Sequence, residues 1–163
     1  MTYRHRGHGT DRGDFLDYGP IVSCRIHRPE AFAAITSAAH LDARVLIDTG
    51  GGFTGIDEDV LRTVGLPTHR IRDVRGATGG WQERPTFRVD VSMLVFNDDG
   101  ARRTIRVPMI EAVPLRSEYR KDAPYLGFLG RDFLDYFQLV YDGPSMEYEL
   151  VVPPGSGGLV RRR

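Results

Sequence analysis

The sequence predicts an all-β domain with one or two short helices. Apolar residues alternate with polar ones in several short stretches, most clearly at Phe87, Val89, Val91 and Met93, and this period of two is typical of a half-buried strand. Glycine accounts for 19 of the 163 residues and proline for 10, and both residue types favour turns between short strands. The segments with helical features are few and short.

Length and composition indicate one soluble domain. At 18.3 kDa the chain is long enough to bury a core without disulfide or metal staples. Arginine plus lysine and aspartate plus glutamate both number 22, so the net charge is zero, which argues against a surface for nucleic acid or another polyanion. The single cysteine excludes an internal disulfide framework. We expect a cytoplasmic protein with no membrane partner, because no spanning run or signal segment is found.

The chain divides into one domain and two terminal segments. Residues 1–18 are polar and charged, and we expect a flexible arm. Residues 153–163 join a Pro-Gly-Ser-rich stretch to three arginines, which predicts a flexible basic tail. The domain therefore spans residues 19–152, without internal repeats.

The first half of the domain predicts two strands and two short helices. Apolar and β-branched residues favour strands at 21–26 and 43–48. Between them, the alanine-rich segment 29–41 has a proline near its start, which favours a short inserted helix. The segment 56–64 carries acids early and apolar residues at helical spacing. Gly65 follows it, so a helix of one or two turns is predicted to end there.

The second half predicts further strands, turns and one short helix. Two strand arms at 69–77 and 81–95 flank a glycine-rich tip. A turn at 97–100 and a strand at 104–110 follow, and the polar stretch 113–124 is expected to be a surface loop. The last elements that we expect are an apolar strand end at 128–130, a short helix at 131–136 and strands at 137–141 and 148–152.

Asp48, Thr49 and Gly50 form the most informative motif. The acid ends the buried apolar stretch 45–47, where its carboxylate would be partly desolvated and rigidly placed. The loop N–H groups and the threonine hydroxyl are near enough to orient it. The plain alternative is a turn that ends a strand, since all three residue types favour turns.

Two further motifs accompany the aspartate. Thr78, Gly79, Gly80 and Trp81 lie at the tip between the two strand arms, where they form either a mobile cover over a ligand or an ordinary hairpin turn with the tryptophan packed beneath it. Phe128, Leu129 and Gly130 run into Arg131 and the following helix, and their alternative reading is simple core and turn.

In this order, over roughly residues 19–152, the motifs resemble those of the retropepsin-like aspartic proteases, the single-lobe relatives of pepsin. The resemblance implies a closed β-barrel of the acid protease fold and a homodimer. Asp48 matches the catalytic aspartate, with Thr49 and Gly50 completing the catalytic signature. Gly79, Gly80 and Trp81 match the tip of the substrate-binding flap, to which Thr78 is adjacent. Phe128, Leu129, Gly130 and Arg131 match the support of the catalytic loop.

The resemblance implies an aspartic endopeptidase that hydrolyses an extended peptide or protein substrate. Peptide hydrolysis of this kind needs two adjacent carboxylates, and no second Asp-Thr/Ser-Gly is present, so two copies of Asp48 must meet on a twofold axis. The family usually has Ala or Ser after the signature, and its retroviral members have an acid that pairs with the arginine. Here Gly51 and Gly52 occupy these places. The alternative is therefore a catalytically silent dimer that binds or scaffolds peptides.

Other chemistries find no support in the sequence. The five histidines, His5, His8, His27, His40 and His69, lack metal-ligand spacing, so we expect no metal and no cofactor. Cys24 lies in a predicted strand and is interpreted as a small core residue. The glycine run at 50–52 lacks a following lysine and a long helix, which argues against a phosphate-binding loop.

Overall fold

The computed structural model describes residues 2–8, 19–29, 40–76, 79–116, 123–154 and 160–161. The elements, in chain order, are β1 (Tyr3–His8), β2 (Ile21–His27), β3 (His40–Ile47), β4 (Thr54–Asp57), α2 (Glu58–Val64), β5 (Thr68–Arg75), β6 (Trp81–Asn97), β7 (Arg102–Leu115), β8 (Gly127–Leu129), α3 (Arg131–Leu134), β9 (Gln138–Asp142), β10 (Glu147–Val152) and β11 (Val160–Arg161). Strands predominate, and the predicted all-β class with short helices is confirmed.

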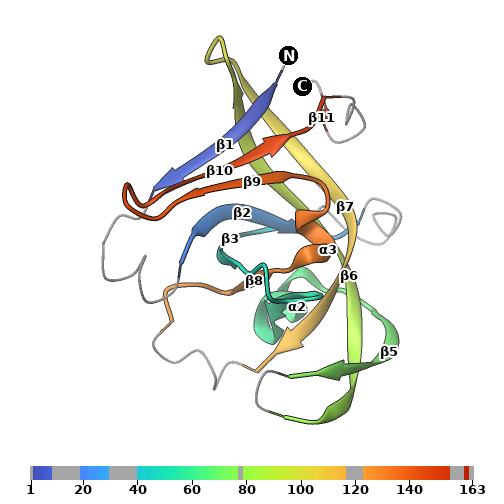
Figure 1. Ribbon diagram of the computed structural model, residues 1–163. Helices are drawn as coiled ribbons and strands as arrows, with labels where there is room; N and C mark the ends of the chain where they lie inside the picture. The colour runs from blue at the N-terminus through green and yellow to red at the C-terminus, as the bar shows by residue number, and fades with distance from the viewer. Residues whose placement is uncertain are drawn as a thin grey trace.

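Six strands close into a barrel (Figure 1). The long strands β6 and β7 pair antiparallel, and β2 joins β6 to β3 through two further antiparallel pairings. On the other side, β7 pairs in parallel with β4, which lies antiparallel to β8. The parallel pairing of β8 with β3 closes the ring.

The barrel interior is filled by every second residue of its strands. In β2 the buried positions are 22, 24 and 26, while Ser23 and Arg25 are exposed. The same period of two operates in β3, where Ala43, Val45 and Ile47 are buried. Leu129 from β8 and Phe133 from α3 complete this core and are fully inaccessible to solvent. Burial of these apolar side chains is the main force that closes the ring.

Helix α2 follows its predicted limits closely. Asp57 caps its start by accepting hydrogen bonds from the amides of Asp59 (2.9 Å) and Val60 (3.2 Å). Gly65 ends it in the left-handed conformation, with φ of 67°, which a residue with a side chain rarely adopts. The local capping signals in the sequence were therefore sufficient to place this helix.

Two extensions project from the barrel (Figure 1). Strands β1, β10 and β9 form an antiparallel layer beyond β6, with β9 at its edge. Strand β5 pairs with the first residues of β6, and we call this hairpin, which spans residues 68–87, the hairpin arm. Figure 1 shows the arm at the opposite end of the molecule from the turn that joins β6 to β7.

Three expectations differ from the structure. Residues 3–8 were expected in a flexible arm but form β1, because their backbone pairs with β10 over six positions. Residues 113–115 were expected in a surface loop but belong to β7, where their parallel pairing with β4 buries Val113. In the expected flexible tail, Val160 and Arg161 pair with β7 as β11.

Some expectations fall on residues outside the described ranges. These are Met1 and residues 9–18 of the N-terminal arm, residues 30–39 of the expected inserted helix, Ala77 and Thr78 at the hairpin tip, residues 117–122 of the expected loop 113–124, and residues 155–159 and 162–163 of the tail. Within the described part of the chain, neither helix has the length or the apolar character needed to cross a membrane.

Candidate active site around Asp48

Asp48 lies at the end of β3, in a loop that passes over the neighbouring strand β8. Its backbone N–H donates to the carbonyl of Leu129 (3.0 Å), which continues the parallel β3–β8 pairing by one residue. The preceding amide, that of Ile47, donates to the carbonyl of Pro20 (2.8 Å). The chain then turns through residues 48–53, which we call the aspartate loop, into β4. Because β8 lies between β3 and β4, the loop position is fixed from both sides.

The loop backbone curls around the Asp48 carboxylate. The N–H of Gly50 donates to Oδ1 (2.9 Å), and the N–H of Gly51 donates to the Asp48 carbonyl (3.3 Å). A Cβ added at Gly50 would lie 3.2 Å from Oδ1, and one at Gly51 would lie 3.1 Å from Oδ2. The glycines therefore let the chain approach the carboxylate closely. Asp48 is half-buried, whereas Thr49 and Gly50 are exposed.

The segment from β8 to α3 supports the aspartate loop from below. The amide of Arg131 donates to the carbonyl of Gly51 (2.8 Å). A Cβ at Gly130 would overlap the carbonyl oxygen of Phe53, so only glycine allows the two backbones to come this close. The structure thus brings Gly130 and Arg131 against the loop that carries Asp48, as the predicted site requires.

Thr54 and Asp132 form a buried polar link that the sequence analysis did not identify. The Thr54 hydroxyl donates to Asp132 Oδ1 (2.8 Å) and accepts from the amide of Gly130 (3.2 Å). Thr54 is fully buried, and burial raises the pKa of Asp132. Oδ2 of Asp132 is buried without a hydrogen-bond partner. The one signal in the sequence was an acid in the first turn of the predicted helix, which is too common to mark a site.

The Arg131 side chain points toward the loop but meets no acid there. Its Nη2 lies 3.5 Å from the position that a Cβ on Gly52 would occupy. An acid at residue 52 would be well placed to pair with it, and the glycine supplies no such group. Among the described residues, the exposed Arg131 guanidinium forms no hydrogen bond or ion pair.

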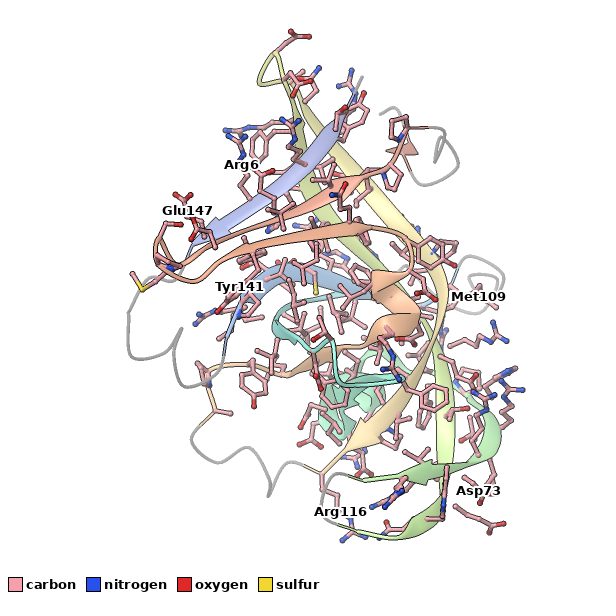
Figure 2. The ribbon with its side chains drawn as sticks, in the orientation of Figure 1. Arg6, Asp73, Met109, Arg116, Tyr141 and Glu147 are labelled. Atoms are coloured by element: carbon pink, nitrogen blue, oxygen red, sulfur yellow. The ribbon has the colours of Figure 1, made fainter. Side chains whose placement is uncertain are left out.

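The hairpin arm carries three of the predicted tip residues, Gly79, Gly80 and Trp81, into solvent. Trp81 pairs with Arg75 at the last register position before the tip, and its side chain is 70% exposed, so it does not pack beneath the hairpin. Ile71, on β5, is 66% exposed. Gly79 and Gly80 are exposed as well, and a Cβ at Gly80 would meet nothing within 4 Å. Figure 2 labels Asp73 on this arm, far from Glu147 on β10.

Glu111, on β7, anchors the base of the hairpin arm. It accepts two hydrogen bonds from Arg70, at 2.7 and 2.5 Å, and one from the Thr86 hydroxyl at 2.8 Å. Arg72 lies 3.3 Å from the same carboxylate. These contacts, with the hydrogen bonds from Arg70 foremost, hold the pKa of Glu111 at about 2, well below its usual value.

Arg72 also links the arm to the aspartate loop. Its guanidinium lies over the ring of Phe53, 4.9 Å from the ring centroid, in a cation–π contact. Through this contact and the Glu111 anchor, the arm is fixed at its base while its tip stands in solvent. Sequence reasoning found the arm but not this anchor, because Glu111 lies 41 residues from Arg70.

The other candidate groups occupy structural positions. Burial raises the pKa of Cys24 to about 12, so its thiol stays protonated and is a poor nucleophile. His27 contacts the Ser92 hydroxyl (2.6 Å), and burial together with nearby Arg106 lowers its pKa to about 4. In the described ranges, no three His, Cys, Asp or Glu side chains gather closely enough to hold a metal ion.

Searches with protein-family models and among curated proteins found no match to this chain.

Proposed function

We propose that the protein is an aspartic endopeptidase of the retropepsin-like class, in which two copies of Asp48 meet across a homodimer. One observation carries the proposal. A half-buried carboxylate is held by a glycine amide in a loop that β8 and Gly130 support, at one end of a closed barrel. A strand-ending turn alone requires none of this supporting structure.

The second carboxylate comes from the partner subunit. Thr49 and Gly50 are exposed beside the half-buried Asp48, so the aspartate loop is accessible to a second copy of the same loop. A twofold axis through this point places like residues opposite each other. Two carboxylates that come this close cannot both ionise easily, and the pair holds one proton.

The shared proton allows hydrolysis without a covalent intermediate. The ionised carboxylate takes a proton from water as the water oxygen bonds to the scissile carbonyl carbon, and the protonated carboxyl gives its proton to the carbonyl oxygen. The carbon–nitrogen bond of the resulting gem-diol then breaks. The amine leaving group receives a proton from one carboxyl, and the other carboxylate takes one from the diol, so the pair again holds one proton.

The hairpin arm serves as the cover of the substrate. Its fixed base, anchored by Glu111 and Arg72, and its exposed tip with Gly79, Gly80 and Trp81 suit a flap that closes over an extended peptide and excludes water. The exposed apolar side chains of Ile71 and Trp81 are available to contact that peptide.

A peptide-library experiment tests this proposal. Purified protein and the Asp48→Asn variant are incubated with mixed peptides between pH 4 and 7, and cleavage is read by mass spectrometry. We expect cuts that the wild type makes and the variant does not. Cuts that persist in the variant would rule out an Asp48 dyad.

The same experiment separates the peptide-binding alternative, which Gly51 and Gly52 favour because they leave Arg131 without an acidic partner. If folded wild-type dimers cut nothing yet retain extended peptides on size-exclusion chromatography, the dimer binds peptides without hydrolysing them.

A further inference from the structure

A basic groove lies on the outer face of the barrel, apart from the aspartate loop. It crosses β3, β2, β6 and β7 and has a volume of about 610 Å³. Its lining residues are Ser23, Cys24, Arg25, Asp42, Ala43, Arg44, Ser92, Met93, Leu94, Arg102, Arg103 and Thr104. Four of these are arginines and one is an acid, in a protein whose net charge is zero. We call this feature the arginine groove.

Strand register explains why the arginines gather here. Arg44 lies opposite Ser23, and Arg25 lies between Asp42 on one side and Ser92 on the other. Arg25 and Arg44 occupy outward positions of their strands, because residues on either side of them point into the core. The face therefore presents basic side chains in adjacent rows.

Much of this positive charge is uncompensated. Arg25 pairs with Asp42 (2.6 Å). By contrast, within the described ranges the Arg44 guanidinium forms no hydrogen bond or ion pair, and that of Arg102 makes only a contact with the Phe96 ring, at 5.9 Å from the ring centroid. Arg103 donates to the backbone carbonyl of Arg102, which carries no net charge. A concave surface with this imbalance concentrates positive potential and attracts anions.

We infer that the arginine groove binds an acidic peptide segment that also carries apolar residues. Guanidinium groups form strong hydrogen bonds with carboxylates, and the groove already contains one such contact, from Arg25 Nε to Asp42 Oδ1. Leu94 is 41% exposed at the groove and Phe96, beneath Arg102, is 37% exposed, so apolar side chains of the peptide find contacts beside the charges.

The sheet face favours a peptide over a phosphate-bearing ligand. Phosphate sites in proteins commonly use backbone N–H groups, whereas the backbone amides here lie in the plane of the sheet and pair between strands. The charge of Asp42 also opposes a doubly charged phosphate more than a carboxylate. Nucleic acid would need a larger basic excess than this neutral chain offers.

The groove is separate from the proposed catalytic centre. Arg44 precedes Asp48 by four residues along β3, a distance of about 13 Å in a strand. The inference therefore does not rest on proteolysis, and it is tested on the Asp48→Asn chain, in which the proposed catalysis is absent.

The test measures binding of a fluorescein-labelled peptide of alternating Glu and Leu by fluorescence anisotropy, with the full-length chain. A matched peptide with Lys in place of Glu is the ligand control. We expect the acidic peptide to bind, binding to weaken as salt rises, and the Lys peptide not to bind. Replacing Arg44 and Arg102 together by glutamate should weaken binding at least about tenfold.

Matched variants keep the test decisive. Arg75→Glu changes an exposed arginine on the hairpin arm, outside the groove, and should leave affinity unchanged. Arg44→Gln, which removes charge without reversing it, should give an intermediate loss, and circular dichroism checks that each variant is folded. Absence of binding, equal loss with Arg75→Glu or equal binding of the Lys peptide would overturn the inference. So would displacement by equimolar inorganic phosphate or tighter binding of single-stranded DNA.

Discussion

At the scale of single residues, the support beneath the aspartate loop depends on an acid that is only partly solvated. Burial raises the pKa of Asp132, whereas hydrogen bonds from Thr54 and the amide of Phe133 act in the opposite direction. A carboxyl with a raised pKa in the folded state contributes most stability below its unfolded pKa. That contribution is lost as the pH rises through the folded value. Asp132 therefore costs stability at neutral pH.

We expect Asp132→Asn to raise Tm by a few °C at pH 7, since the amide keeps an oxygen that accepts from Thr54 and carries no charge. The gain should shrink as the pH falls from neutral through the raised pKa of the wild-type carboxyl, because the protonated carboxyl carries no charge. Thermal melts across this range measure it. Thr54→Val is the control and should lower Tm at every pH. If the gain in Tm of Asp132→Asn were the same at every pH, the buried charge of Asp132 would not be its cause.

Gly130 lies where two backbone segments come very close together. A Cβ there would overlap the Phe53 carbonyl and lie 3.0 Å from that of Gly51, and neither group is a flexible side chain that can move aside. We expect Gly130→Ala to lower the free energy of unfolding by about 1–3 kcal/mol, measured by urea denaturation. Gly80→Ala is the matched control, because a Cβ at that position would meet nothing within 4 Å. Equal effects of the two substitutions would show that the close approach does not matter.

Some residues of the candidate site were predictable from the sequence and others were not. Asp48, Thr49 and Gly50 form a contiguous motif, and Gly130 lies in a short one, so both were recognisable. Thr54 and Asp132 were not, because their link joins positions 78 residues apart and neither has a local signature. Whether Asp48 is catalytic stays a prediction.

At the scale of elements, the hairpin arm depends on Glu111. The low pKa of Glu111, about 2, means that its contacts stabilise the fold above the ordinary glutamate pKa near 4.5. This contribution is lost as the pH falls from about 4.5 through about 2. Because Arg70 is half-exposed, solvent screening reduces the size of the contribution.

We expect Glu111→Gln to lower the free energy of unfolding at pH 7 by about 1 kcal/mol and to speed hydrogen exchange in the hairpin arm. Asp73→Asn, an exposed acid on the same arm, is the control and should change neither quantity. If exchange in the arm stays slow in Glu111→Gln, the arm is held by its strand pairing alone.

Helices and turns that depend on nearby capping or turn residues were predicted well. Strands that form by pairing with segments far away in the sequence were not. Asp57 and Gly65 flank α2 with caps that act within a few residues. The turn after Asn97 was likewise predicted and is confirmed by the hydrogen bond from the Gly100 amide to the Asn97 carbonyl (3.0 Å). By contrast, β1 is a polar segment that becomes a strand by pairing with β10, near the other end of the chain, and with the end of β6. The end of β7 depends in the same way on β4.

At the scale of the whole molecule, the closed barrel fixes the position of the aspartate loop relative to the hairpin arm. Parallel pairings of β3 with β8 and of β4 with β7 connect segments distant in sequence, and no local pattern reports them. The pairing of β3 with β8 places the aspartate loop over β8. The contact between Arg72 and Phe53 then joins the hairpin arm to that loop. Under the proposed mechanism, the single Asp-Thr-Gly in the chain makes activity a property of two molecules rather than one.

The most direct test of this claim is a mixing experiment. Wild type and Asp48→Asn are combined in equal amounts under conditions that allow subunit exchange, and peptidase activity is compared with that of the wild type alone at the same total concentration. If each active centre needs an Asp48 from both subunits, only wild-type homodimers cut, and activity falls to about one quarter. Activity that falls only to about one half would contradict the shared dyad, because each wild-type subunit would then work alone or beside an inactive partner.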